Sequence, residues 1–251
     1  MSWQLRFLGV GNSQAAPVLG SASAVLESDG LPQLLIDCGQ ETLTAYLARY
    51  GQAPRAIFIT HLHLDHVGGL ERLFYTAYFD DALRGKIKLF VPAAIVPAMQ
   101  SRLADYPGVL AEGGANWWDA FQLIPVSTGF WHEGLHFSVF PVRHHLPDSA
   151  FGVRLPGSFL WTGDTRPIPE RLAESVLAGE VIAHDCGLVG NPSHTGLADI
   201  QREYPASWWP SLVLYHYASH ADAEAMQAQG FRVAGTGQVF ELPAPASEPL
   251  A

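Results

Sequence analysis

Short apolar segments with strand character alternate with segments of helical periodicity over most of the chain. Apolar or alternating runs predict strands at residues 4–10, 22–26, 33–37, 56–59, 87–91, 135–143, 158–161, 180–184 and 211–215. Helical periodicity predicts helices at residues 41–50, 70–79, 94–105, 169–178 and 196–203. Strands that alternate with helices in this way are typical of an α/β fold.

The chain shows no obvious internal division. Its 251 residues suffice for one large domain or two small ones, and neither a linker nor an internal repeat separates two parts. We therefore expect one domain over residues 1–251. Residues 244–251 are rich in Pro, Ala and Glu and are expected to form a disordered tail. The Gly-rich segment 106–120 contains Trp117 and Trp118 and is predicted to be a loop that covers the functional site.

Composition and charge favour a core-rich enzyme and argue against long nucleic acids as partners. Hydrophobic residues make up 48% of the chain, charged residues 15%, and the formal net charge is −10. A nucleic-acid-binding surface normally carries a basic patch, although bound metal cations would reverse the charge locally. Cys38 and Cys186 stand in apolar segments without a Cys-x-x-Cys pattern, so buried free thiols are expected.

A cluster of metal-binding side chains directly follows the apolar run at 56–59. Its members are His61, His63, Asp65 and His66. Alternate residues of an extended segment share a face, so the first three are expected to point one way while the fourth turns in where the chain bends. Imidazole and carboxylate suit zinc, manganese or iron, and four such groups exceed what one catalytic metal takes from six residues. The cluster therefore predicts two adjacent metal ions that share these ligands.

The motif His-x-His-x-Asp-His at residues 61–66 resembles the signature of the metallo-β-lactamase superfamily of hydrolases. The resemblance implies a four-layer αββα sandwich, in which two mixed β-sheets are flanked by helices and the metal ions lie at one edge. It also implies three further ligands, which must follow in order at the ends of later strands.

The third histidine of the superfamily is expected at His144 or His145. Residues 144–149, His-His-Leu-Pro-Asp-Ser, resemble the His-x-Ile-Pro-Asp-Ser form of the RNA-processing branches, which places the ligand at His144. Strand alternation by itself leaves both residues open, because a shift of register by one residue reverses the face.

Two later strands end in residues that match the remaining ligands. Asp164, in Gly163-Asp164-Thr165, looks like the aspartate that bridges the two ions, because each carboxylate oxygen can bind one of them. An ordinary turn is the alternative. His216 follows an apolar strand and matches the last ligand. The nearby His220 is the alternative, which we assign to the rim of the pocket.

The implied ligand set is two groups that share one aspartate. His61, His63 and His144 would hold one ion, Asp65, His66 and His216 the other, and Asp164 would bridge them. Zinc is the expected metal, with manganese and iron as alternatives. Asp37 ends a predicted strand and either orients a metal-binding histidine from behind or forms a turn.

Asp185 and His194 are expected to act on the leaving group. Residues 162–167 and the segment around both residues resemble ribonuclease Z-like phosphodiesterases, in which a histidine at the position of His194, steadied by an acid at that of Asp185, protonates the leaving oxygen. An imidazolium suits this task because its pKa lies near working pH. The alternative is that His194 caps the helix beginning near Gly196. Asp65 completes the expected catalytic residues, with a hydroxide that bridges the two ions as the nucleophile.

The order of these motifs resembles the phosphoribosyl cyclic phosphodiesterase branch, which also has a Gly-Phe-x-Val segment like residues 230–233. That branch has a cysteine-rich zinc knuckle, whereas residues 14–30 contain no cysteine. Ribonuclease Z has a long arm that grips transfer RNA, but only 19 residues separate His144 from Asp164. A small cyclic or nucleotide-like phosphodiester is therefore the expected substrate. The nearest cations for a second phosphate are Arg143, Arg154 and Arg166.

Two other functions stay open at this stage. An acyl hydrolase that uses the same ions on a lactone or thioester is favoured if Trp117 and Trp118 form an apolar pocket. A non-catalytic binding protein on the same fold is disfavoured, because all seven ligand types are present. The chain has no recognisable secretory leader and no apolar run of membrane-spanning length, so we expect a cytoplasmic protein. A homodimer is an open option.

Overall fold

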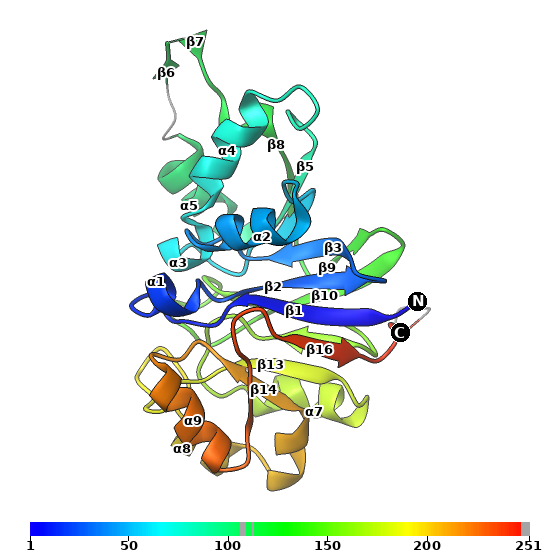
Figure 1. Ribbon diagram of the computed structural model, residues 1–251, viewed down its shortest axis with the longest axis vertical. Helices are drawn as coiled ribbons and strands as arrows, with labels where there is room; N and C mark the ends of the chain where they lie inside the picture. Colours follow the sequence, from blue (N-terminus) through cyan, green and yellow to red (C-terminus); the bar gives the residue numbers. More distant parts are fainter. Residues whose placement is uncertain (106–108, 112, 247–251) are drawn as a thin grey trace.

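Two seven-stranded sheets pack face to face at the centre of the structure, a computed structural model that describes residues 1–105, 109–111 and 113–246 (Figure 1). The strands of the first sheet are, in order, β16 (Val239–Leu242), β1 (Trp3–Gly9), β2 (Ser23–Ser28), β3 (Leu31–Ile36), β4 (Ala56–Phe58), β5 (Ile87–Pro92) and β8 (Phe121–Val126). Neighbours from β16 to β3 are antiparallel, and those from β3 to β8 are parallel.

The second sheet is mixed in the same way. Its strands are, in order, β15 (Arg232–Val233), β14 (Leu212–Tyr215), β13 (Val181–Asp185), β12 (Phe159–Trp161), β11 (Phe151–Leu155), β10 (Leu135–Pro141) and β9 (Gly129–His132). Neighbours from β12 to β15 are parallel and those from β9 to β12 antiparallel. Parallel segments need both faces covered, which explains why strands such as β4 and β13 are buried throughout.

Helices cover the outer faces of both sheets (Figure 1). The helices beside the first sheet are α2 (Thr42–Tyr50) and α4 (Leu70–Tyr78), and those beside the second are α7 (Pro169–Leu177), α8 (Leu197–Glu203) and α9 (His220–Ala228). Shorter elements are α1 (Ala16–Leu19), α3 (Leu64–Val67), η1 (Ala93–Ile95), α5 (Val96–Met99), η2 (Gln100–Ala104), β6 (Val109–Leu110), β7 (Gly113–Gly114), α6 (Trp117–Ala120) and η3 (Ala206–Ser211). The predicted four-layer αββα sandwich is confirmed.

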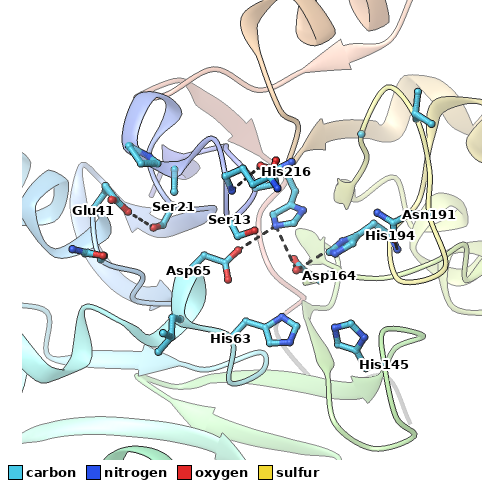
Figure 2. Close-up of a pocket in the computed structure, with 18 residues that line it drawn as sticks. Ser13, Ser21, Glu41, His63, Asp65, His145, Asp164, Asn191, His194 and His216 are labelled. Atoms are coloured by element: carbon cyan, nitrogen blue, oxygen red, sulfur yellow. Dashed lines mark hydrogen bonds and ion pairs between the residues drawn. The ribbon is translucent and has the colours of Figure 1, made fainter.

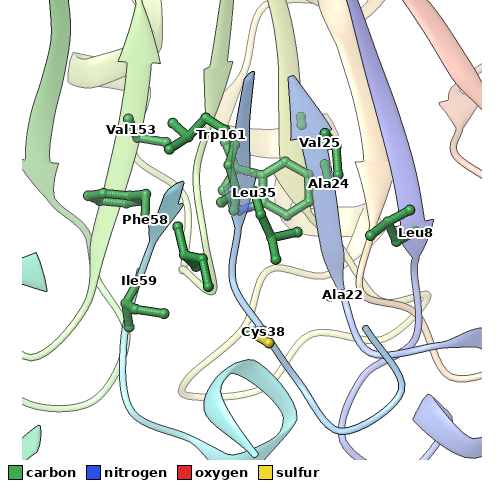
Figure 3. Packing of buried hydrophobic residues seen from close by; sticks show 14 of the residues in the cluster. Leu8, Ala22, Ala24, Val25, Leu35, Cys38, Phe58, Ile59, Val153 and Trp161 are labelled. Atoms are coloured by element: carbon green, nitrogen blue, oxygen red, sulfur yellow. The ribbon is translucent and has the colours of Figure 1, made fainter. Parts of the chain in front are cut away.

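Aromatic side chains join the two sheets in the core. The Phe7 ring, on β1, lies 5.5 Å from the Trp161 ring on β12 and 6.0 Å from the Tyr215 ring on β14. Phe58 of β4 stacks on Phe130 of β9 at 5.8 Å. Figure 3 shows this layer, with Cys38 beyond the end of β3. Large apolar side chains of this kind supply most of the free energy of folding, because burial removes their surface from water.

The parallel strands end at one common edge, and this is where the polar residues collect. Asp164, Asp185 and His216 lie at or just after the ends of β12, β13 and β14, which are neighbours in the second sheet. Asp37 and His61 follow the neighbouring strands β3 and β4 of the first sheet. Because the carboxyl ends of parallel neighbours meet, residues far apart in sequence are brought together across this edge.

Several elements differ from the sequence prediction. Residues 94–105 were expected to form one helix and instead form η1, α5 and η2, with Pro97 near the start of α5. Strands β8, β9, β11 and β16 and helix α9 were not predicted. Pro125 lies inside β8, and proline argues against a central strand, but β8 is the last strand of its sheet, where a missing N–H donor is tolerated.

The predicted covering loop at residues 106–120 is wrong for the part that the structure describes. Trp117 is 1% exposed and stacks on Phe74 of α4, with ring centroids 5.2 Å apart. The indole N–H of Trp118 donates to Gln100. The β6–β7 hairpin points away from α3 at one end of the long axis (Figure 1). Residues 106–108 and 112 lie outside the described residues.

Two further expectations concern the thiols and the tail. Cys38 and Cys186 are free and buried, as predicted. Within the predicted tail the Ala246 N–H donates to the Pro156 carbonyl, and residues 247–251 lie outside the described residues. Of the helices that the structure describes, none combines the length and apolar character that a membrane crossing requires.

Candidate metal centre

The histidine-rich motif begins extended and then turns into a helix. The chain is extended through His63, and α3 starts at Leu64, so Asp65 and His66 lie in its first turns. The expected alternation along one extended segment is therefore wrong beyond His63. The side chains still converge: Nε2 of His61 lies 3.0 Å from Nδ1 of His63, and the rings of His61 and His66 are 4.1 Å apart.

One group of side chains contains three histidines and a carboxylate. Its members are His61, His63, His144 and Asp164, whose ligand atoms all lie within 4.8 Å of one another. Nε2 of His144 is 3.3 Å from Nδ1 of His63, and Nε2 of His61 is 3.6 Å from Oδ2 of Asp164. Nitrogen and oxygen atoms that converge on one point are the arrangement a divalent metal requires.

A second group shares Asp164 with the first. Its members are Asp65, His66, Asp164 and His216. Nε2 of His66 is 3.3 Å from Oδ1 of Asp164, while Nε2 of His216 is 3.4 Å from its Oδ2. Nε2 of His216 also lies 3.7 Å from Oδ2 of Asp65 (Figure 2). The structure thus brings together all seven residues of the predicted ligand set.

Asp164 occupies its central position because glycine precedes it. Gly163 has φ +64°, in the left-handed region, and a Cβ there would lie 3.0 Å from the Phe151 carbonyl oxygen. Only glycine adopts such a turn without strain. The turn directs a fully buried carboxylate into the space between the histidines, with each oxygen facing different rings.

Asp37 holds His66 from behind. Its Oδ2 is 2.8 Å from Nδ1 of His66, and the same carboxylate accepts from the N–H and hydroxyl of Thr60. Nδ1 of His66 therefore donates to Asp37, and in the neutral ring Nε2 has the lone pair, aimed at the second group. Asp37 also has φ +61°, in the left-handed region, directly after the end of β3. Its contact with His66 agrees with the expectation that it orients a histidine from behind.

The adjacent histidines His144 and His145 have different surroundings. His144 is buried, and its Nδ1–H donates to the Ser193 carbonyl at 2.9 Å, which directs Nε2 toward His63. His145 is exposed and its Nδ1 lies 3.1 Å from the Ser193 hydroxyl. Among the described residues, His144 and not His145 belongs to a potential metal-binding group. His220 is exposed at the start of α9 and does not line the cavity, so its assignment to the pocket rim is wrong.

Asp185 contacts two histidines. Its Oδ2 accepts from Nδ1 of His194 at 2.9 Å, and its Oδ1 lies 3.3 Å from Nδ1 of His216. His194 does not cap α8: the capping residue is Gly196, whose N–H donates to Asp199. Asp164, Asp185, His194 and His216 form a third, overlapping group that could hold a cation. Sequence reasoning missed the contact between Asp185 and His216, for which the local sequence carries no signal.

The buried carboxylates of the site carry negative charge that a cation would balance. Burial lowers the pKa of His144 to about 4, and that of His61 well below its ordinary value, so both rings are neutral near pH 7. Burial also opposes the charged forms of His66 and His216, but the surrounding carboxylates outweigh it and raise both pKa values, to about 10 for His216. Without another cation, the rings of His66 and His216 are therefore protonated beside the carboxylates. A divalent ion would supply that charge and displace these protons.

Several buried polar atoms have no hydrogen-bond partner among the described residues. They include Nε2 of His66, Nε2 of His216 and Oδ1 of Asp164. An unpaired buried polar atom is costly, and such atoms normally find a partner. All three point into the shared space between the groups, where a metal ion would satisfy them. The residues present therefore fit a divalent metal.

A cavity of about 750 Å³ opens beside these groups (Figure 2). The site residues that line it are His63, Asp65, Asp164, His194 and His216. Burial opposes the charged form of His194, but the hydrogen bond and the charge of Asp185 raise its pKa above 6.5. Nδ1 of this ring donates to Asp185 and lies 3.9 Å from Oδ2 of Asp164, so the ring stands at the cavity wall, where a histidine can deliver a proton to a bound molecule.

Known proteins share this fold and sequence pattern. The model of the family described as Anti-Pycsar protein Apyc1 matches residues 3–240. The Apyc1 protein of Paenibacillus harenae is 31% identical over 251 residues, covering 95% of this chain and 99% of that protein. The human zinc phosphodiesterase ELAC protein 1 is 41% identical over 78 residues, which is 30% of this chain and 21% of that protein.

Two solved structures resemble the whole chain in fold. A diphosphatase of the PhnP family has a TM-score of 0.73 at 19% identity, covering 97% of this chain and 99% of its own. The metallo-β-lactamase fold protein YhfI of Bacillus subtilis has a TM-score of 0.71 at 13% identity, covering 96% and 100%. The fold is thus that of the metallo-β-lactamase superfamily, and by its sequence the chain belongs to the Anti-Pycsar protein Apyc1 family.

Proposed function

We propose that this protein is a metal-dependent phosphodiesterase that hydrolyses a small cyclic or nucleotide-like phosphodiester. Membership of the Apyc1 family and the local identity to a zinc phosphodiesterase support this reaction class. The cavity of about 750 Å³ is of the size that takes a small molecule. The observation that carries the proposal is the pair Asp185–His194, which presents a proton donor beside the candidate metal ligands.

The proposed cofactor is a pair of divalent ions, with zinc as the first choice and manganese or iron as alternatives. His61, His63 and His144 would hold one, Asp65, His66 and His216 the other, and Asp164 both. When bound, such ions would lower the pKa of a bound water molecule and neutralise charge on a phosphoryl group. The fully buried Asp164 and the paired Asp37–His66 keep the ligand atoms oriented before any metal binds.

Proton transfer and positioning are assigned to three residues of the chain. His194 donates a proton to the departing oxygen, which an alkoxide leaving group needs and a nitrophenolate does not. Asp185 holds the proton on Nδ1 of His194 and keeps the ring against the cavity. Asp65 lies at the mouth of the site, partly exposed and 3.7 Å from Nε2 of His216, where it can serve as ligand and contact the reacting group.

The alternative of an acyl hydrolase has lost the feature that favoured it. It required an apolar pocket made by Trp117 and Trp118, but Trp117 packs on Phe74 in the core, and neither tryptophan lines the cavity. We further propose that residues 1–251 form one domain and that the protein acts in the cytoplasm, with a homodimer as the oligomeric state to test first.

The reaction class is tested on purified protein whose metal content has been measured. The substrates are bis(p-nitrophenyl) phosphate, nucleoside 2′,3′- and 3′,5′-cyclic monophosphates, a lactone and a thioester. We expect hydrolysis of phosphodiesters that is lost with chelator and restored by zinc or manganese. Activity confined to lactones or thioesters would overturn the proposal. Asp164→Ala is the negative control, because it removes the carboxylate common to both groups.

A further inference from the structure

Apart from the candidate metal ligands and the rings of His145 and His194, the wall of the cavity combines apolar side chains with polar side chains that are almost all uncharged. It contains the amide side chains of Asn12, Gln14, Gln40 and Asn191 and the hydroxyls of Ser13 and Ser21. Among the described residues, no lysine or arginine lines it. Glu41 supplies the one carboxylate outside the metal-binding groups. On the side of the cavity away from His145 and His194, a phosphate would therefore meet uncharged groups and one negative charge.

The arginines expected to hold a second phosphate lie elsewhere. Arg154 is buried on β11 and engaged by Glu180 and Glu174. Arg143 pairs with Glu170 at 3.1 Å. Together with Arg166 and His144 it lines a separate cavity of about 300 Å³. The sequence-based assignment of these three cations to a second phosphate in the main cavity is therefore not supported.

Glu41 is held in a defined orientation at the cavity wall. The Ser21 hydroxyl donates to its Oε2 at 2.6 Å, and Ser21 is itself buried. A carboxylate has further lone pairs and can accept from a ligand at the same time. In Figure 2 Glu41 and His194 lie on opposite sides, with Asp65 and Asp164 between them. Because both residues line the same cavity, a substrate of sufficient length can meet His194 at one end and Glu41 at the other.

We infer that this cavity selects phosphodiesters that carry a single phosphate and that Glu41 is the residue that determines this specificity. The inference rests on the proposed phosphodiesterase function. Glu41 accepts a hydrogen bond from a hydroxyl or amino group on the neutral part of the substrate and repels a phosphomonoester at that position. Repulsion between two unit charges at contact distance weakens binding by roughly tenfold or more, depending on how far water is excluded.

Two ligands that differ by one phosphate test the inference. Uridine 2′,3′-cyclic monophosphate and its 5′-phosphorylated form serve as competitive inhibitors of bis(p-nitrophenyl) phosphate hydrolysis by the metal-loaded protein. For the wild type we expect the inhibition constant of the 5′-phosphorylated ligand to be at least about tenfold higher than that of the ligand with one phosphate. Glu41→Gln should reduce this ratio to roughly threefold or less, and Glu41→Lys should reverse it.

Glu41 can be changed without removing a helix cap, because its side chain makes no capping hydrogen bond to α2. Glu224→Lys, on the exposed face of α9, is the matched control for the change in net charge and should keep the wild-type ratio. Arg166→Ala tests whether the separate cavity binds the second phosphate. We expect it to leave the inhibition constants of both ligands unchanged.

Three results would overturn the inference. They are a preference of the wild type for the 5′-phosphorylated ligand, a ratio that Glu41→Gln leaves unchanged, and failure of both ligands to compete at millimolar concentration. If the wild type prefers the 5′-phosphorylated ligand and Arg166→Ala loses that preference, the second phosphate binds beside Arg143 instead. Failure of the metal-loaded wild type to hydrolyse bis(p-nitrophenyl) phosphate or any cyclic phosphate is a separate outcome, which would reject the proposed function itself.

Discussion

Oδ1 of Asp185 lies 3.3 Å from Nδ1 of His216, while Oδ2 of the same carboxylate accepts from His194. One buried carboxylate therefore hydrogen-bonds the candidate proton donor and lies in ion-pair range of a candidate metal ligand. The Thr165 N–H also donates to Oδ2, which ties this arrangement to the turn that carries Asp164. The sequence suggested only the contact with His194, so the consequences of changing Asp185 are broader than a lost proton donor.

Replacing Asp185 with asparagine should weaken metal binding and proton donation together. Mutation of a carboxylate that lies behind a ligating histidine typically lowers metal affinity about 10–100-fold. We expect such a loss in Asp185→Asn, measured by competition with a chromophoric chelator. His194→Ala should keep its metal affinity, because His194 belongs to neither of the two proposed ligand groups. Equal affinity in Asp185→Asn and the wild type would show that the contact with His216 is unimportant.

His194→Ala should reveal its role through the leaving group. General acid catalysis typically contributes about 10²–10⁴-fold. We expect a loss of that order on an alkyl phosphodiester and a much smaller loss on bis(p-nitrophenyl) phosphate, whose nitrophenolate leaves without a proton. The measurement is kcat/KM on both substrates at equal metal content. Equal losses on the two substrates would exclude His194 as the acid.

The adjacent histidines should separate clearly in metal content. In His144→Ala a buried ligand atom is removed, so metal affinity should fall by more than the roughly 100-fold that an outer contact costs. His145→Ala removes an exposed ring outside the two groups and should retain its metal. Metal analysis after dialysis compares the two variants. The opposite pattern would show that His145, and not His144, is the metal ligand.

The buried ion pair between Arg154 and Glu180 should matter for stability and not for chemistry. Glu180 accepts from Nε and Nη2 of Arg154 and from the Gly157 N–H. Glu180→Gln leaves a buried guanidinium without its counter-charge and should lower the free energy of unfolding by about 3 kcal/mol. Glu174→Gln is the control, because Glu174 contacts the same arginine but is 68% exposed, so its loss should cost under about 1 kcal/mol. Urea denaturation measures both; similar costs would contradict this account.

Both thiols should be inert in the folded protein. Burial, with a smaller contribution from Asp37, raises the pKa of Cys38 to about 12, and burial raises that of Cys186 well above its ordinary value. Because the thiolate is the reactive form, neither cysteine should react with a disulfide reagent at pH 8 until the protein unfolds. Titration should count two thiols in guanidinium chloride and none in native buffer. Rapid reaction of a thiol in the native protein would show that it is accessible.

The sequence alone identified the candidate ligands of the site and most of the framework around it. His61, His63, Asp65 and His66 are neighbours in the chain, so their convergence depends on local geometry. Asp164 and His216 were recognisable because each directly follows a buried strand, and parallel strands end at a common edge. Apolar periodicity identified these strands, because burial of one or both faces leaves its pattern in the residues themselves.

Only the tertiary structure decided which distant groups meet. No local pattern indicates that Asp185 reaches His216, that the Ser193 carbonyl orients His144, or that Glu41 lies across the cavity from His194. The tryptophans at 117 and 118 read equally well as a pocket or as core, and packing against Phe74 settled the matter for Trp117. Such contacts depend on strand register and on the packing of whole layers, and a shift of one residue reverses every side chain on a strand.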